Sequence, residues 1–278
     1  MGLYLDLAFA QNALVAATLI ALICGLLGPY IVARDMAFAV HGSAELTFTG
    51  AAAGLLIAGD AVAGALAGSV VVALLIGLLG DRPRERNSAI GVILATGLGV
   101  GILLLSFYRG FASAATNILF GQIFGVSRAD LVVLGVVAVV IAVTIGVIHR
   151  PLLFASIDPA VAAARGVRGR MLGLVFALLL ALTVVEASQI VGTLLVLALA
   201  ITPAAAARHL TASPRGVTVV AVVVAVVSAD LGLLLSLATN IKASFFISAT
   251  SFVCYAIARI LGATVLRHRG RLPDPAHV

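Results

Sequence analysis

The chain has 278 residues, of which 63% are hydrophobic and 10% charged, and its mean hydropathy is +1.24. A soluble domain needs a largely polar surface and cannot hide this share of apolar side chains, so we expect a polytopic membrane protein. The net charge of +6 does not indicate a nucleic-acid partner, because Lys and Arg are confined to short connections between apolar runs.

The apolar runs are about 20 residues long, the length that an α-helix needs to cross the hydrocarbon core. They predict an all-α transmembrane bundle of about eight or nine spans within residues 1–265. The candidate spans are residues 9–33, 36–57, 60–80, 88–107, 129–148, 171–187, 189–207, 216–238 and 243–265. The sixth and seventh could instead form one long tilted helix. Residues 111–125 are predicted to form a shallow or re-entrant helix, too short to cross.

The distribution of arginine predicts the orientation. If the loop over residues 81–87 is cytoplasmic, most other basic connections and the basic tail, residues 266–278, also lie in the cytoplasm. This positive-inside bias predicts a multi-pass membrane protein with the N-terminus outside and the C-terminus inside.

Two ionisable residues interrupt the second candidate span. His41 and Glu45 stand four residues apart in AVHGSAELTFTG, so both project from one helix face. An imidazole and a carboxylate together suit Zn²⁺, Mn²⁺ or Fe²⁺. The alternative is a buried His–Glu hydrogen bond that pins the helix to a neighbour, and the spacing alone does not decide between them.

Two more acids lie within candidate spans. Glu186 is near the outer end of the sixth, where a structural or interfacial role is favoured over a ligand role. Asp230 either faces the transport path or is hydrogen-bonded inside the bundle. Intramembrane acids are costly, which makes each a candidate for function.

The longest cytoplasmic connection, residues 149–170, contains the run DPAVAAARGVRGR. Asp158 is predicted to cap a short helix that has Pro159 at its first position and ends at Gly166. By itself this helix could dock a cytoplasmic partner or serve only as a linker.

Five stretches carry a resemblance to a known family. In chain order they are ALICGLLGPYIVARDMAFAVHGSAELTFTGAAAG, NSAIGVILATGLGVGILLLS, ILFGQIFGVSRADL, SIDPAVAAARGV and ASQIVGTLLVLALAITPAAAAR. The chain resembles the membrane permease of ABC-3 type metal-uptake systems, the importers of zinc, manganese or iron. The most specific part is the block at residues 189–208, with Gln189, Gly192 and Pro203.

The resemblance implies a type II-like importer fold and a homodimer in the bacterial inner membrane, bound by two cytoplasmic ATPase subunits and supplied by an extracytoplasmic metal-binding protein. The chain itself would be no enzyme and would hold no permanent cofactor, because ATP is hydrolysed by the partner. The loop over residues 149–170 would contain the coupling helix, with Asp158, Pro159, Arg165, Gly166 and Arg168.

The second span departs from the family pattern in an informative way. Relatives typically read Asp-Ala-Leu-Ser-His there; the aspartate position falls on His41 and the histidine position on Glu45. One acid and one imidazole therefore remain four residues apart in exchanged order, which favours metal contact over packing and leaves the metal open. We expect His41 and Glu45, with Asp230 as a further candidate, to bind the ion in transit. A proton-coupled secondary metal transporter is the alternative.

Overall fold

The computed structural model describes residues 8–78, 83–108, 121–239 and 241–269. Within these ranges all regular secondary structure is helical, and nine helices have 18 residues or more. The nine are α2 (Ala8–Ala33), α3 (Ala37–Ala58), α4 (Ala61–Leu78), α5 (Pro83–Ser106), α7 (Arg128–Ile157), α9 (Gly169–Ile190), α10 (Thr193–Leu210), α11 (Pro214–Thr239) and α12 (Ala243–Arg269). Two short elements join them, the 3₁₀ helix η1 (Ile123–Gly125) and α8 (Pro159–Ala164).

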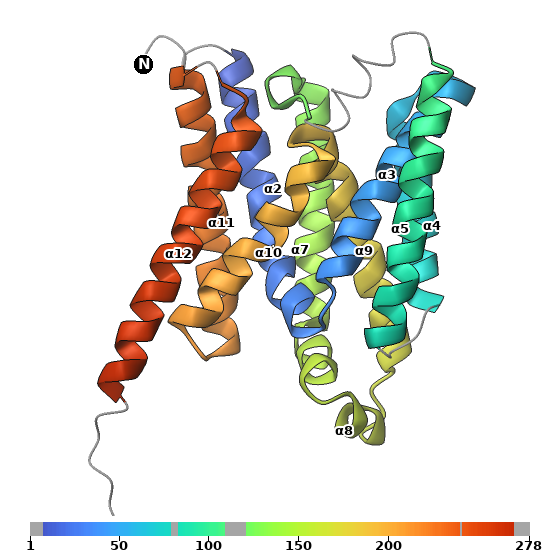
Figure 1. Ribbon diagram of the computed structural model, residues 1–278. Coiled ribbons are helices and arrows are strands. Elements are labelled where there is room, and N and C mark those ends of the chain that lie inside the picture. The colour runs from blue at the N-terminus through green and yellow to red at the C-terminus, as the bar shows by residue number, and fades with distance from the viewer. Residues whose placement is uncertain (1–7, 79–82, 109–120, 240, 270–278) are drawn as a thin grey trace, which may run out of the picture.

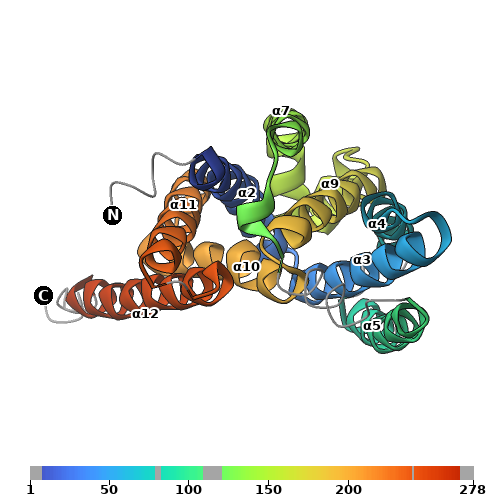
Figure 2. The same ribbon diagram turned by 90° about the horizontal axis from the view of Figure 1, so that it is seen from above.

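The long helices run side by side as one bundle, and α8 projects beyond the end where α7 finishes and α9 starts (Figure 1). Viewed along the bundle, α10 lies near the middle, with α12 at one extreme and α4 and α5 at the other (Figure 2). Helix α2 packs against α7, α9, α10 and α11, whereas α3 packs against α4, α5, α9 and α10.

Helix α2 forms the centre of the core. Its fully buried residues recur at helical spacing, among them Ala13, Ala17, Ile20, Cys24 and Leu27. Small residues on the same helix allow its neighbours to come close, because a Cβ at Gly28 would lie 2.7 Å from the Ala200 carbonyl oxygen of α10. The close approach of the α2 and α10 backbones therefore stabilises this part of the bundle.

Six helices contain segments long and apolar enough to cross a membrane: α2, α5, α7, α9, α11 and α12. Shorter apolar helical stretches cover residues 61–77 in α4 and 196–210 in α10. Helix α3 is not among the six although it has 22 residues, since His41, Glu45 and several hydroxyl residues lower its hydropathy. The prediction of a polytopic helical membrane protein is confirmed.

Small residues four apart on a helix allow close helix contacts. Such glycine pairs lie at contacts in α3 (Gly50 and Gly54), α4 (Gly64 and Gly68) and α5 (Gly97 and Gly101). A Cβ at Gly64 of α4 would stand 2.2 Å from the Gly50 carbonyl oxygen of α3, and one at Gly54 would stand 2.6 Å from the Gly64 Cα. On the neighbouring helix α5, a Cβ at Gly97 would stand 2.6 Å from the Leu46 side chain of α3. These contacts fix α3 between α4 and α5.

The helix ends differ from the predicted ones at several places. Helix α7 continues past residue 148 and through Pro151 to Ile157, because Leu152 and Ala155 are buried and hold the extra turns against the bundle. The non-helical part of the predicted loop over residues 149–170 is therefore shorter than expected. Helix α12 likewise continues to Arg269, into the predicted tail. Residues 270–278 of that tail, and residues 111–120 of the predicted shallow helix, lie outside the described residues.

The sixth and seventh spans are separate helices, so the alternative of one long tilted helix is wrong. Helix α9 ends at Ile190 and α10 begins at Thr193. Between them Gly192 has a φ of 101°, in the region that favours glycine. The break lies at Gly192, whereas residues 186–189, around the predicted boundary of the two spans, are helical.

Candidate functional site

The first half of α3 places polar groups in the interior of the bundle. Ser43, Glu45 and Thr47 are at most 5% exposed. The Ser43 Oγ, Glu45 Oε2 and Thr47 Oγ1 atoms have no hydrogen-bond partner among the described residues. A buried polar atom left unpaired costs about 1–3 kcal/mol, so these atoms indicate a role beyond packing.

His41 and Glu45 lie one turn apart on α3, and their charges are close enough to interact. His41 is half-buried and Glu45 is buried. Within the described part of the chain, no hydrogen bond is made by either side chain. The structural alternative requires a His–Glu hydrogen bond that pins α3 to a neighbour, and the described residues do not make this hydrogen bond.

The chemistry of the pair fits a transition metal ion, because neutral imidazole and carboxylate are common ligands of Zn²⁺, Mn²⁺ and Fe²⁺. Among the described residues, however, no three His, Cys, Asp or Glu side chains gather closely enough to hold a metal ion. The described residues of one chain therefore offer one imidazole and one carboxylate here. A second chain, backbone carbonyls and water are possible sources of further ligands.

Asp230 takes part in a different contact. Its Oδ1 accepts a hydrogen bond of 3.1 Å from the Thr18 hydroxyl, which joins α11 to α2. The main neighbours of α11 are α2, α10 and α12, so Asp230 lies on a different side of the bundle from α3. This geometry favours the interpretation of Asp230 as a hydrogen-bonded residue inside the bundle.

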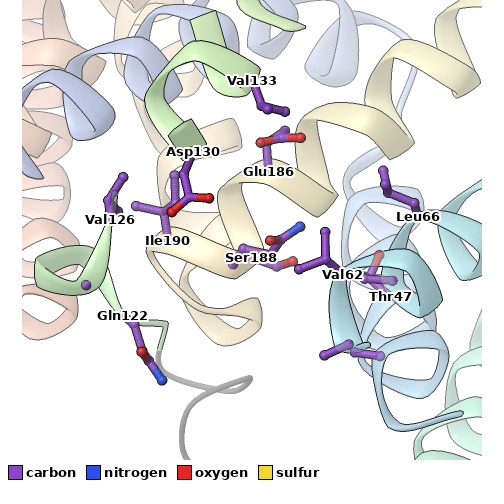
Figure 3. Close-up of a pocket in the computed structure, with 15 residues that line it drawn as sticks. Thr47, Val62, Leu66, Gln122, Val126, Asp130, Val133, Glu186, Ser188 and Ile190 are labelled. Carbon is purple, nitrogen blue, oxygen red and sulfur yellow. The ribbon is translucent and has the colours of Figure 1, made fainter. Parts of the chain in front are cut away.

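A cavity of about 430 Å³ opens where α3, α4, α7 and α9 meet near η1 (Figure 3). Glu186 of α9 and Asp130 of α7 both reach it, and their charges are close enough to repel each other. Thr47, Ser188 and Gln189 add polar groups to its lining. Thr47 is two residues from Glu45, about 200° around the helix, so the cavity and the His41–Glu45 pair lie on opposite faces of α3.

Sequence reasoning did not find this cavity. Asp130 has a local signal, because it closes a capping box with Ser127, whose hydroxyl accepts from the Asp130 N–H at 3.2 Å. That signal locates the start of α7 but does not reveal that this start lies beside Glu186, over 50 residues later.

The residues of the most specific motif shape the junction of α9 and α10. The Gln189 carbonyl accepts a 3.4 Å hydrogen bond from the Gln122 N–H. A Cβ at Gly121 would lie 2.4 Å from the Ile190 carbonyl oxygen, so only glycine fits there. Pro203 lies inside α10 and removes one backbone hydrogen bond from it. Gly121 and Gln122 therefore pack closely against the junction of α9 and α10.

Helix α8 has the form predicted for it. The Asp158 carboxylate accepts a 3.0 Å hydrogen bond from the Val161 N–H, and Pro159 occupies the first position. Gly166, with a φ of 79°, follows the helix. Arg165 and Arg168 are exposed, and α8 stands clear of the bundle (Figure 1). A short, capped and exposed helix with basic flanks is suited to contact another protein.

Comparison with known proteins gives one consistent result. The profile of the "ABC 3 transport family" matches residues 6–262. The chain is 34% identical over 256 residues to the manganese transport system membrane protein MntC of Halalkalibacterium halodurans, covering 91% of this chain and 87% of that protein. It is 30% identical to the manganese import system permease protein ScaB of Streptococcus parasanguinis, covering 90% and 89%. The structure is also similar to that of PsaBC from Streptococcus pneumoniae in complex with Fab, with a TM-score of 0.82, 27% identity and 91% of each chain covered.

Proposed function

The chain belongs to the ABC 3 transport family, and we propose that it is the membrane permease of an ATP-driven importer of divalent transition metal ions, with manganese as the first candidate before zinc and iron. The observation that carries the proposal is the Glu45 carboxylate, buried on α3 with an unpaired Oε2 and with His41 one turn away. The names of the two manganese relatives favour Mn²⁺ over the other ions. Carboxylate, carbonyl and water ligands also suit Mn²⁺.

Two copies of the chain form the transport path. Each contributes His41 and Glu45, because a single chain brings no third His, Cys, Asp or Glu to this position in its described part. Two such pairs supply four side-chain ligands across a two-fold axis. An ion held by ligands from two movable subunits can be bound and then released as they separate.

The nine long helices each cross the membrane, α3 and α10 included. An odd number of spans places the chain ends on opposite sides, and the positive-inside rule puts α8 and the C-terminal end of α12 in the cytoplasm. His41 and Glu45 then lie in the cytoplasmic half of α3, because that helix begins on the same side as α8 (Figure 1).

Helix α8 docks in the cytoplasmic ATPase subunit, and a metal-binding protein delivers the ion at the opposite end. The chain hydrolyses no ATP itself. Movement of the ATPase reaches the bundle through α8, which is linked directly to α7 and, through a short connection, to α9. The metal is cargo in this scheme, and Asp230 is not one of its ligands.

Reconstitution into liposomes with the ATPase partner tests the proposal. Mn²⁺ uptake should require ATP, and the His41→Ala/Glu45→Ala variant should lose at least about tenfold, since even losing a second-shell partner of a metal ligand costs about 10–100-fold. Asp230→Asn is the matched control, a carboxylate change between α2 and α11 that should leave uptake largely intact. Uptake driven by a proton gradient without ATP would support the secondary transporter instead.

A further inference from the structure

We propose that the cavity between α4 and α7 binds a lipid, namely the primary ammonium headgroup and one acyl chain of a phosphatidylethanolamine from the leaflet opposite α8. This site goes beyond metal transport and depends only on the chain being embedded in a membrane. It lies on the face of α3 opposite His41 and Glu45, so the two sites can be tested separately.

The polar end of the cavity has the chemistry of an ammonium site. Glu186 accepts no hydrogen bond from the described residues, and the same residues donate to Asp130 only at its Oδ2, in the capping box. The Thr47 side chain, 1% exposed and with an unpaired Oγ1, lies on the cavity side of α3 (Figure 3). Two acids whose charges repel each other and an unsatisfied hydroxyl together favour a cation with several N–H donors.

The rest of the cavity wall is mostly apolar, apart from Gln122, Ser188 and Gln189, and opens to the membrane. Its wall includes Val62 and Leu66 of α4 and Val133 of α7, which are 47%, 38% and 56% exposed. Helix α9 continues this surface towards the middle of the bundle, because Leu178 and Leu182 precede Glu186 at intervals of four residues on one helix face and Leu178 is 39% exposed. A cavity with an acidic end and an apolar groove fits an amphiphile, which has a charged headgroup and an apolar chain, better than it fits a free ion.

A metal ion fits the cavity less well. Only two carboxylates reach it, and no group of three His, Cys, Asp or Glu side chains in the described residues could hold a metal. A volume of about 430 Å³ with mostly apolar walls is typical of a site for an organic ligand.

The test uses the full chain in nanodiscs that contain phosphatidylethanolamine and phosphatidylcholine in equal amounts. Native mass spectrometry then counts the lipids retained by the released protein. We expect phosphatidylethanolamine to be enriched, because a quaternary ammonium has no N–H to donate. Glu186→Gln should reduce the enrichment about tenfold, the typical effect of removing a charge-assisted hydrogen bond. Leu66→Trp, which fills the mouth without changing a charge, should reduce it as well.

The matched control is Glu45→Gln, a carboxylate change on the opposite face of α3, which should leave the lipid enrichment unchanged. Thermal unfolding verifies that each variant is folded. Equal retention of the two lipids by the wild type, or unchanged enrichment in Glu186→Gln, would overturn the proposal. If lipid binding fails while metal uptake still depends on Glu45, the transport proposal stands alone.

Discussion

The Tyr30 hydroxyl and the His149 Nδ1 atom share a hydrogen bond that joins α2 to α7 near the end of the bundle that bears α8. Their rings also meet edge to face, with centroids 6.2 Å apart. Tyr30 belongs to the central helix of the core, whereas α7 leads directly into α8. The contact therefore ties the core to the helix that would meet the ATPase.

Tyr30→Phe should keep the ring packing and remove the hydrogen bond. We expect a loss of about 1 kcal/mol, seen as a lower midpoint of thermal unfolding in detergent. The control is Tyr255→Phe, at a tyrosine that packs against His209 with centroids 5.6 Å apart. Equal shifts in the two variants would show that the Tyr30 hydroxyl contributes nothing specific.

Gly64→Ala should separate α3 from α4. The added Cβ would stand 2.2 Å from the Gly50 carbonyl oxygen, and backbone cannot move aside cheaply. Overpacking of this kind costs about 1–3 kcal/mol, which should lower the thermal midpoint.

Gly99→Ala is the matched control on α5, where an added Cβ meets nothing within 4 Å. Alanine is the better helix former, so this variant should be neutral or slightly more stable. If the two alanine variants behaved alike, the close approach of α3 and α4 would be refuted.

Glu45→Met distinguishes the two interpretations of the His41–Glu45 pair, metal contact and a structural hydrogen bond. They predict opposite shifts of the midpoint of thermal unfolding. A buried carboxylate with an unpaired oxygen costs stability, so an apolar side chain of similar size should raise the thermal midpoint while Mn²⁺ uptake is lost. A carboxylate that pins α3 through a hydrogen bond would give a lower midpoint instead. Unfolding and uptake measured on the same preparation decide the question.

Asp158→Ala should weaken α8 and with it the contact with the ATPase. Loss of an N-cap costs about 1 kcal/mol of local helix stability, so we expect weaker co-purification of the ATPase and slower metal-coupled ATP hydrolysis. Asp60→Ala removes the equivalent cap of α4, whose Val62 N–H donates to Asp60 at 2.9 Å at the opposite end of the bundle. It should cost similar stability and leave ATPase binding intact.

Local chemistry allowed much of this fold to be predicted. The Asp158 cap, Pro159 and the glycine after α8 each follow from short-range backbone rules, and the structure has them as expected. The polar character of α3 was likewise visible, because His41 and Glu45 stand out in an apolar run. Features that depend on long-range packing were not predictable. The length of α7 depends on burial of Leu152, and the cavity depends on Asp130 lying beside Glu186.

The two polar faces of α3 have a consequence for how the chain enters the membrane. His41 and Glu45 occupy one face and Ser43 and Thr47 another, so polar groups stand on two nearly opposite sides of the first half of this helix. A helix of this kind inserts poorly into the bilayer on its own and is stabilised there by packing against neighbouring helices. Those partners, α4 and α5, are synthesised after it. We expect α3 to remain beside the insertion machinery until α4 emerges, so that the two enter the bilayer as a hairpin.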